Sequence, residues 1–153
     1  ILISLLVMLT ILGVQEFKLL YVQPINFDSS KIITIEKEAG WVDFVSNNEI
    51  TKNGLVTISG WAIDPEQIQP ASDIVLVFED MIIPSKVTWH SRDALVEIFG
   101  TNHVRDSGWV LEVNSRYFEF GKNKFEIYSE TIDGKYIKLN FNEDIDNVLI
   151  ITE

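Results

Sequence analysis

The stretch "VTISGWAIDP", residues 56–65, decides the fold prediction. Its apolar residues alternate with small polar ones, and a period of two is typical of a strand that lies half-buried in a β-sheet. Gly60 and Ala62 thin one face of this strand, which leaves room for a bulky side chain from a facing strand, such as Trp109 or Phe125. The stretch therefore predicts a strand that packs closely against large neighbours.

Trp61 points to the opposite face of the same strand and has two readings. In the first, its ring covers that face near the sheet edge as part of the packing. In the second, its ring is exposed and receives the C–H face of a sugar. We favour packing, since burial is the commoner fate of a tryptophan. The strand is expected to end at Asp64-Pro65, because proline has no N–H to donate to a neighbouring strand.

Similar strand-like runs follow one another from residue 31 to the end of the chain. They are expected at residues 31–37 (KIITIEK), 41–45 (WVDFV), 55–63 (LVTISGWAI), 72–80 (SDIVLVFED), 81–89 (MIIPSKVTW), 108–114 (GWVLEVN), 124–131 (KFEIYSET) and 135–141 (KYIKLNF). Residues 147–152 (NVLIIT) are a candidate for one additional strand. Asp133-Gly134 is a strong hairpin signal between two of these runs. Residues 121–123 indicate another turn, and residues 46–54 read as a polar loop.

Residues 91–100 (SRDALVEIFG) interrupt this pattern and predict a short helix. Ser91 is expected at the N-cap and Gly100 at the C-terminal cap. Asp93 lies in the first turn, where the helix dipole favours an anion. The buried stripe of this helix is expected to consist of Leu95, Ile98 and Phe99.

Seven or eight short strands with one crossover helix predict a mainly β domain over residues 31–153. The expected architecture is an immunoglobulin-like antiparallel β-sandwich, preceded by an N-terminal transmembrane-type helix. No parallel sheet is expected, because the strands do not alternate with long helices. A chain of 153 residues, 46% of them hydrophobic, suits one such domain with its own core.

Residues 1–22 are predicted to be a membrane anchor, since residues 1–14 (ILISLLVMLTILGV) carry no charge. A transmembrane helix needs about 20 apolar residues. The chain opens with Ile1 inside the apolar run, so we expect an upstream part to complete the span. A helix of a soluble domain would show a polar stripe, and a signal peptide would end in small residues; neither sign is present. Residues 23–30 (QPINFDSS) are expected to be a polar linker, in which Pro24 stops the helix.

Composition removes several classes of function. The 23 acidic and 12 basic residues give a formal net charge of -11. Nucleic acid and anionic lipid headgroups both attract cationic surfaces, and the overall composition supplies none, so nucleic acid is not an expected partner. The chain has no cysteine, which excludes disulfides, thiolate metal sites and a cysteine nucleophile.

Candidate catalytic chemistry is sparse, and we expect no catalytic residues and no cofactor. The histidines are His90 and His103, and no G-x-S-x-G motif occurs. His90 and Asp93 would suit acid/base work by their closeness in sequence, but two solvent-facing groups at a helix start are the favoured reading. Acidic residues fall in turns and on outward strand positions, without the cleft and the paired carboxylates that glycoside hydrolysis requires.

The C-terminal stretch matches the spacing of calcium ligands in an EF-hand. Asn142, Asp144, Asp146 and Glu153 stand at the required intervals. Asn147 occupies the position where that loop needs glycine, and the run that follows reads as a strand. A chance match is favoured, and no metal site is expected.

Carbohydrate binding is the alternative function that the residues suggest, because sugars dock on aromatic rings. The candidate ligand-binding residues are Trp61, Trp89, Arg92 and Asp93. Trp89 is the best candidate for an exposed ring, since Arg92 and Asp93 follow it closely. A local ion pair or a capping role for Arg92 and Asp93 is the competing interpretation.

Several motifs in order resemble a known family. They are "GWVDFV", "VTISGWAIDP", "PASDIVLVFED", "SRDALVEIFG", "DSGWVLEV" and "FGKNKFEIYSETIDGK", between residues 40 and 139. The chain is similar here to the extracytoplasmic β-sandwich module that follows the last transmembrane helix of certain bacterial polytopic membrane proteins, many of them glycosyltransferase-like. "FEDMIIP" departs from the family, which often has an Asp-Gly turn there.

The resemblance implies a bacterial cell-membrane protein with its β-domain on the extracytoplasmic side. The family's catalytic residues lie in the membrane part, so none transfers to this chain. The expected function is a non-catalytic accessory domain with a scaffolding or positioning role, as the C-terminal fragment of such a protein. Expected partners are the membrane, the rest of the polytopic protein and cell-envelope glycan.

Overall fold

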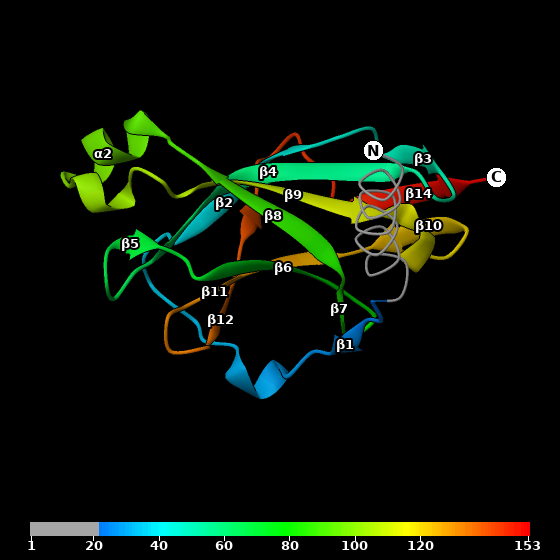
Figure 1. The fold of residues 1–153 in the computed structure, drawn as a ribbon, viewed down its shortest axis with the longest axis horizontal. Coiled ribbons are helices and arrows are strands. Elements are labelled where there is room, and N and C mark those ends of the chain that lie inside the picture. The colour runs from blue at the N-terminus through cyan, green and yellow to red at the C-terminus, as the bar shows by residue number, and fades with distance from the viewer. Residues whose placement is uncertain (1–21) are drawn as a thin grey trace, which may run out of the picture.

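The computed structural model describes residues 22–153, which are mainly β and form three sheets with one α-helix (Figure 1). The mainly β class predicted from the sequence is confirmed. Apart from Val22, the expected anchor at residues 1–22 lies outside the described residues. No helix within residues 22–153 combines the length and the apolar character that crossing a bilayer requires.

The largest sheet has six strands and contains the stretch from which the fold was predicted. In spatial order its strands are β13 (Asn140–Phe141), β2 (Gly40–Val45), β4 (Leu55–Asp64), β9 (Gly108–Asn114) and β8 (Ser85–His90), with β5 (Gln69–Pro70) paired to the end of β4. Strand β4 is the centre of this sheet because its ten residues pair with β2 on one side and β9 on the other.

A five-stranded sheet lies opposite the first, and the two share a core. Its strands are β1 (Ile25–Asn26), β7 (Met81–Ile83), β6 (Asp73–Phe78), β11 (Glu126–Glu130) and β12 (Tyr136–Lys138). The shared core takes Val56, Ile58, Trp109 and Leu111 from the six-stranded sheet and Ile74, Leu76, Ile83 and Ile127 from the five-stranded sheet. The Asp133-Gly134 hairpin between β11 and β12 is confirmed, and Gly134 has the positive φ of 77° that such a turn uses.

Two segments that were predicted to be turns or loops form strands of a third sheet. Its strands are β10 (Gly121–Lys124), β14 (Val148–Thr152) and β3 (Glu49–Thr51), where turns or loops were expected at 121–123 and 46–54. The described residues therefore form more strands than the expected seven or eight. Strand β14 pairs with β3, and β13 with β2, in parallel. The prediction that the strands would not pair in parallel was therefore wrong. Each parallel pair is two or three residues long, and no helical crossover signals it.

Gly60 fulfils the role predicted for it. It lies opposite Trp109 on β9, and a Cβ atom at position 60 would come within 2.8 Å of Trp109 Cζ2 and would overlap the carbonyl oxygen of Trp41. The bulky side chain therefore belongs to the neighbouring strand of the same sheet, whereas a facing strand was expected.

Trp61 packs on the other face of β4, where the helix covers it. Helix α2 (Asp93–Phe99) places Leu95 against Trp61, and the Phe99 ring meets the Trp61 ring edge-on at a centroid distance of 5.8 Å. Trp61 is 8% exposed. The packing reading of Trp61 is confirmed, and the cover is supplied by α2.

Helix α2 differs from its prediction at both its cap and its stripe. Gly100 takes the expected left-handed conformation at the C-terminal end. Arg92 occupies the N-cap without a side-chain capping bond, while the Ser91 hydroxyl donates instead to Asp106 at 2.6 Å. Leu95 is buried, but Ile98 is 72% exposed, because the seven-residue helix turns one narrow face to the sheet.

Contacts to the five-stranded sheet are made along residues 25–33. Strand β1, inside the expected linker, pairs with β7, and the 3-10 helix η1 (Ser29–Lys31) follows. The strand predicted at 31–37 is wrong: Ile32 makes an isolated bridge to Tyr136, because β12 offers a partner edge of three residues. The Phe27 ring lies 5.0 Å from the ring of Tyr136. This segment therefore covers the outer face of the sheet.

Candidate functional site

The two tryptophans predicted as ligand contacts lie on opposite faces of the six-stranded sheet. Trp61 belongs to the cluster under α2, whereas Trp89 is half-buried opposite Trp109 and packs against the main core. The residue of β8 that shares the row and the face of Trp61 is His90, since both pair with Gly108. The two rings therefore do not form one continuous surface.

Arg92 lies at a polar cluster formed from three elements. Its guanidinium pairs with Asp43 of β2, and the Asn142 side-chain amide donates to the other Asp43 oxygen at 3.2 Å. The Arg92 and Asp43 side chains are 35% and 26% exposed, so both remain accessible at the surface. The cluster presents a fixed arrangement of donors and acceptors.

Asp93 faces a different partner from that of Arg92. Its carboxylate pairs with Arg105 Nε at 3.1 Å, and the Arg92 backbone N–H donates to the Arg105 carbonyl at 2.7 Å. These contacts tie the start of α2 to the 3-10 helix η2 (Asn102–Val104), so the local ion-pair interpretation holds for Asp93.

Asp43 and Phe44 were not predicted as site residues; Asp43 contacts the Arg92 side chain, and Phe44 follows it on β2. The register between β2 and β4 shifts between Val42 and Phe44, so Asp43 is the extra residue of a β-bulge. A bulge re-aims side chains, and here Asp43 reaches Arg92 while Phe44 stands 52% exposed. An aspartate inside a run of β-formers was the available signal.

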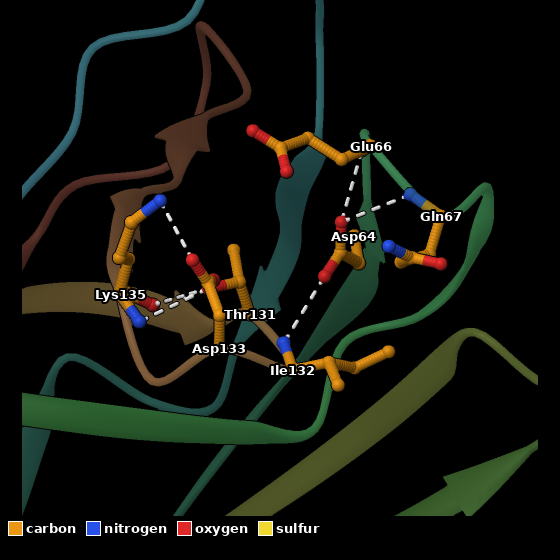
Figure 2. A network of polar contacts seen from close by, with 7 residues as sticks. All are labelled: Asp64, Glu66, Gln67, Thr131, Ile132, Asp133 and Lys135. Carbon is orange, nitrogen blue, oxygen red and sulfur yellow. Dashed lines mark hydrogen bonds and ion pairs between the residues drawn. The ribbon is translucent and has the colours of Figure 1, made fainter.

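A second polar network joins the end of β4 to the β11–β12 hairpin (Figure 2). Asp64 is 3% exposed, and one of its oxygens accepts the backbone N–H groups of Glu66 at 2.9 Å and Gln67 at 3.2 Å. The other oxygen accepts the backbone N–H of Ile132 at 3.0 Å. Asp64 therefore connects two turns that are 68 residues apart in the sequence.

The hairpin that Asp64 holds has its own polar contacts. The Thr131 hydroxyl donates to Asp133 at 2.6 Å and accepts the Lys135 backbone N–H at 3.0 Å (Figure 2). Lys135 Nζ pairs with Asp133 at 2.6 Å. Hydrogen bonds from Lys135 and then Thr131 hold the pKa of Asp133 below its ordinary value. These contacts shape a turn, and each donor is satisfied within it.

A third polar group lies on the outer face of the five-stranded sheet, beside Phe27. Tyr128 donates to Glu126 at 2.6 Å, and Lys138 pairs with the other Glu126 oxygen. Burial, and then the hydrogen bond to Glu126, raises the pKa of Tyr128 well above its ordinary value. Burial opposes ionisation of Glu126, but the bonds from Lys138 and Tyr128 outweigh it and leave the pKa of Glu126 lowered. The Phe27 ring covers Tyr128 at 4.8 Å, so this group serves packing.

Residues 142–153, whose spacing resembles that of an EF-hand and was interpreted as a chance match, are not flanked by two helices. Residues 148–152 form β14, and Glu153 follows it at the chain end. Across residues 22–153, no three His, Asp or Glu side chains gather closely enough to hold a metal ion.

The Arg92 cluster is the arrangement best suited to a ligand. A guanidinium, a carboxylate and an amide can hydrogen-bond hydroxyl groups, and the exposed ring of Phe44, next to Asp43 in the sequence, offers an apolar face. His90 Nδ1 lies 3.2 Å from the Ser91 carbonyl oxygen. This contact is with the backbone and does not pair the imidazole with a nucleophilic side chain. No family model, no curated protein and no solved structure matches this chain.

Proposed function

We propose that the chain is a non-catalytic, membrane-tethered accessory domain. Residues 1–22 serve as the anchor, and the remaining residues form a β-sandwich of immunoglobulin-like type on the extracytoplasmic side of a bacterial membrane. Its parent is a polytopic, glycosyltransferase-like protein, and its role is scaffolding or positioning. The resemblance of residues 40–139 to such modules supports this assignment.

The observation that carries this proposal is the attachment of residues 22–31 to the domain. The Val22 carbonyl accepts the Tyr117 hydroxyl at 2.9 Å, β1 pairs with β7, and Phe27 stacks between Tyr128 and Tyr136. The chain therefore passes from the apolar segment into the sheet without a free linker. A domain joined in this way would keep a fixed orientation to the membrane, which is what a positioning role requires.

We expect the full chain, produced in a bacterium, to stay with the membrane fraction after washing with high salt and alkaline carbonate. The physical reason is that an uncharged apolar run gains free energy in hydrocarbon and does not depend on ionic contacts. The matched control is a chain in which Leu5, Leu6 and Leu9 are replaced by Asp, which should move to the soluble fraction. A freely soluble full-length chain would contradict the proposal.

Carbohydrate binding remains the second candidate, favoured by the accessible Asp43–Arg92 pair and by the exposed ring of Phe44, the next residue after Asp43. If the domain binds cell-envelope glycan there, Phe44→Ala and Arg92→Ala should each weaken binding about tenfold, since stacking and charged hydrogen bonds contribute about 1–2 kcal/mol each. Ile98→Ala, at another exposed apolar residue, is the control. The measurement is a glycan array followed by calorimetry, and unchanged affinity in both variants would remove this site.

A further inference from the structure

The end of the domain at which Val22 lies carries a distinct surface, which we call the η3 corner. It is built on the 3-10 helix η3 (Ser115–Tyr117) and the turn between β3 and β4. Its members are Val22, Lys52, Leu55, Arg116, Tyr117 and Phe120. The Ser115 hydroxyl donates to the Thr51 carbonyl at 2.8 Å, so the two parts of the corner are held together.

Apolar side chains are exposed at the η3 corner. Val22 is 46%, Leu55 59% and Phe120 62% exposed. Ile25, in the adjoining β1, is 62% exposed. Half of the eight most exposed large hydrophobic residues within 22–153 are thus at or next to the place where the chain leaves the apolar segment.

Cations accompany these apolar groups. Lys52 Nζ lies 5.0 Å from the centroid of the Phe120 ring and donates to the Phe118 carbonyl. Arg116 lies over the Tyr117 ring at 4.8 Å and donates to its hydroxyl at 2.7 Å. The amphipathic rings and long cationic side chains are the kind that reach the headgroup level of a bilayer.

The local charge also differs in sign from that of the whole chain. Residues 114–124 carry three cations, at Arg116, Lys122 and Lys124, and one anion, at Glu119, for a net charge of +2. The whole chain has a formal net charge of -11. These cations and Lys52 give this end of the molecule positively charged side chains, which complement anionic lipid headgroups.

We propose that the η3 corner rests on the phospholipid surface, with Tyr117 and Phe120 at the headgroup level and Lys52 and the adjoining Lys122 directed to lipid phosphates. This inference rests on the proposed membrane tether and deepens it, because it states which face of the domain meets the bilayer. A second copy of this acidic chain is a poorer occupant, since two copies repel one another.

The absence of cysteine allows a direct test with a single fluorescent label on the full chain. Phe120→Cys places the label at the corner, and Leu55→Cys places a second label there. Ile98→Cys is the control, since Ile98 is 72% exposed on α2 at the opposite end of the molecule (Figure 1). Each protein is reconstituted in vesicles of phosphatidylethanolamine and phosphatidylglycerol that contain headgroup-quencher lipids.

We expect the full chain to float with the vesicles, most of the fluorescence at positions 120 and 55 to be lost, and that at position 98 to be retained. Lys122→Glu should reduce the quenching at position 120. Lys37→Glu should leave it unchanged, because exposed Lys37 lies near Ala39, whose carbonyl accepts from Ile63 at the opposite end of β4 from Leu55. Flotation without quenching at position 120 overturns the inference and leaves the tether standing. A chain that does not float overturns both. Concentration-dependent protection of position 120 in detergent assigns the corner to a second copy and also overturns the inference.

Discussion

Replacing Asp64 with alanine is expected to lower the free energy of unfolding by about 3 kcal/mol, because three backbone N–H groups lose a charged acceptor in a buried place. The N–H groups are those of Glu66, Gln67 and Ile132. Urea denaturation followed by tryptophan fluorescence measures the change. The midpoint should fall without a change in slope, because the folded core is retained.

Asp64→Asn is the matched variant, since its oxygen can still accept from Glu66 and Gln67 while its amide nitrogen faces the Ile132 N–H. Its free energy of unfolding should lie between that of the wild type and that of Asp64→Ala. Asp146→Ala is the control for removing a carboxylate at an exposed position. An Asp64→Ala protein as stable as the wild type would mean that the two turns need no connection through this side chain.

Asp64 also illustrates which parts of the fold the sequence could predict. The end of the strand at Asp64-Pro65 follows from local chemistry, and β4 does end there. The bond to Ile132 depends on a residue 68 positions away, and no periodicity carries that information. The long alternating strands β4, β6 and β9 were therefore predicted, while this connection between the turns was not.

The missed strands have a related physical cause. Strands β10 and β3 are short and largely polar, and they are strands because β14 lies between them. Residues 31–37 show the opposite case: their β-branched sequence favours a strand, but they have no long partner strand and make only one isolated bridge. Pairing depends on a partner edge, which tertiary structure supplies and local propensity does not.

The candidate site was predicted in part for a similar reason. Arg92 was identified because it closely follows Trp89 in the sequence, and the structure leaves it accessible. Its partner Asp43 comes from a strand 49 residues earlier, and a bulge turns it toward the helix. Trp61 and Trp89 were chosen because sugars dock on aromatic rings, and residue type alone does not tell which face of a sheet is covered.

Gly60→Ala is expected to destabilise the domain by about 3 kcal/mol, the upper range for adding one methyl group to a tightly packed core. The new Cβ would overlap the Trp41 carbonyl oxygen and crowd Trp109, and the backbone of β2 or β4 would have to shift. Thermal unfolding by circular dichroism measures the loss, and near-ultraviolet ellipticity reports whether the Trp109 environment changes.

Gly100→Ala is the control for adding a methyl group to a glycine elsewhere in the chain. No atom lies within 4 Å of a Cβ there, but its φ of +69° costs a side chain about 1 kcal/mol. Gly60→Ala should therefore be the more destabilising of the two, although the backbone at position 60 has no positive φ. Equal losses would mean that β2 and β4 can separate easily. The close approach of these two strands would then not be what holds the six-stranded sheet together.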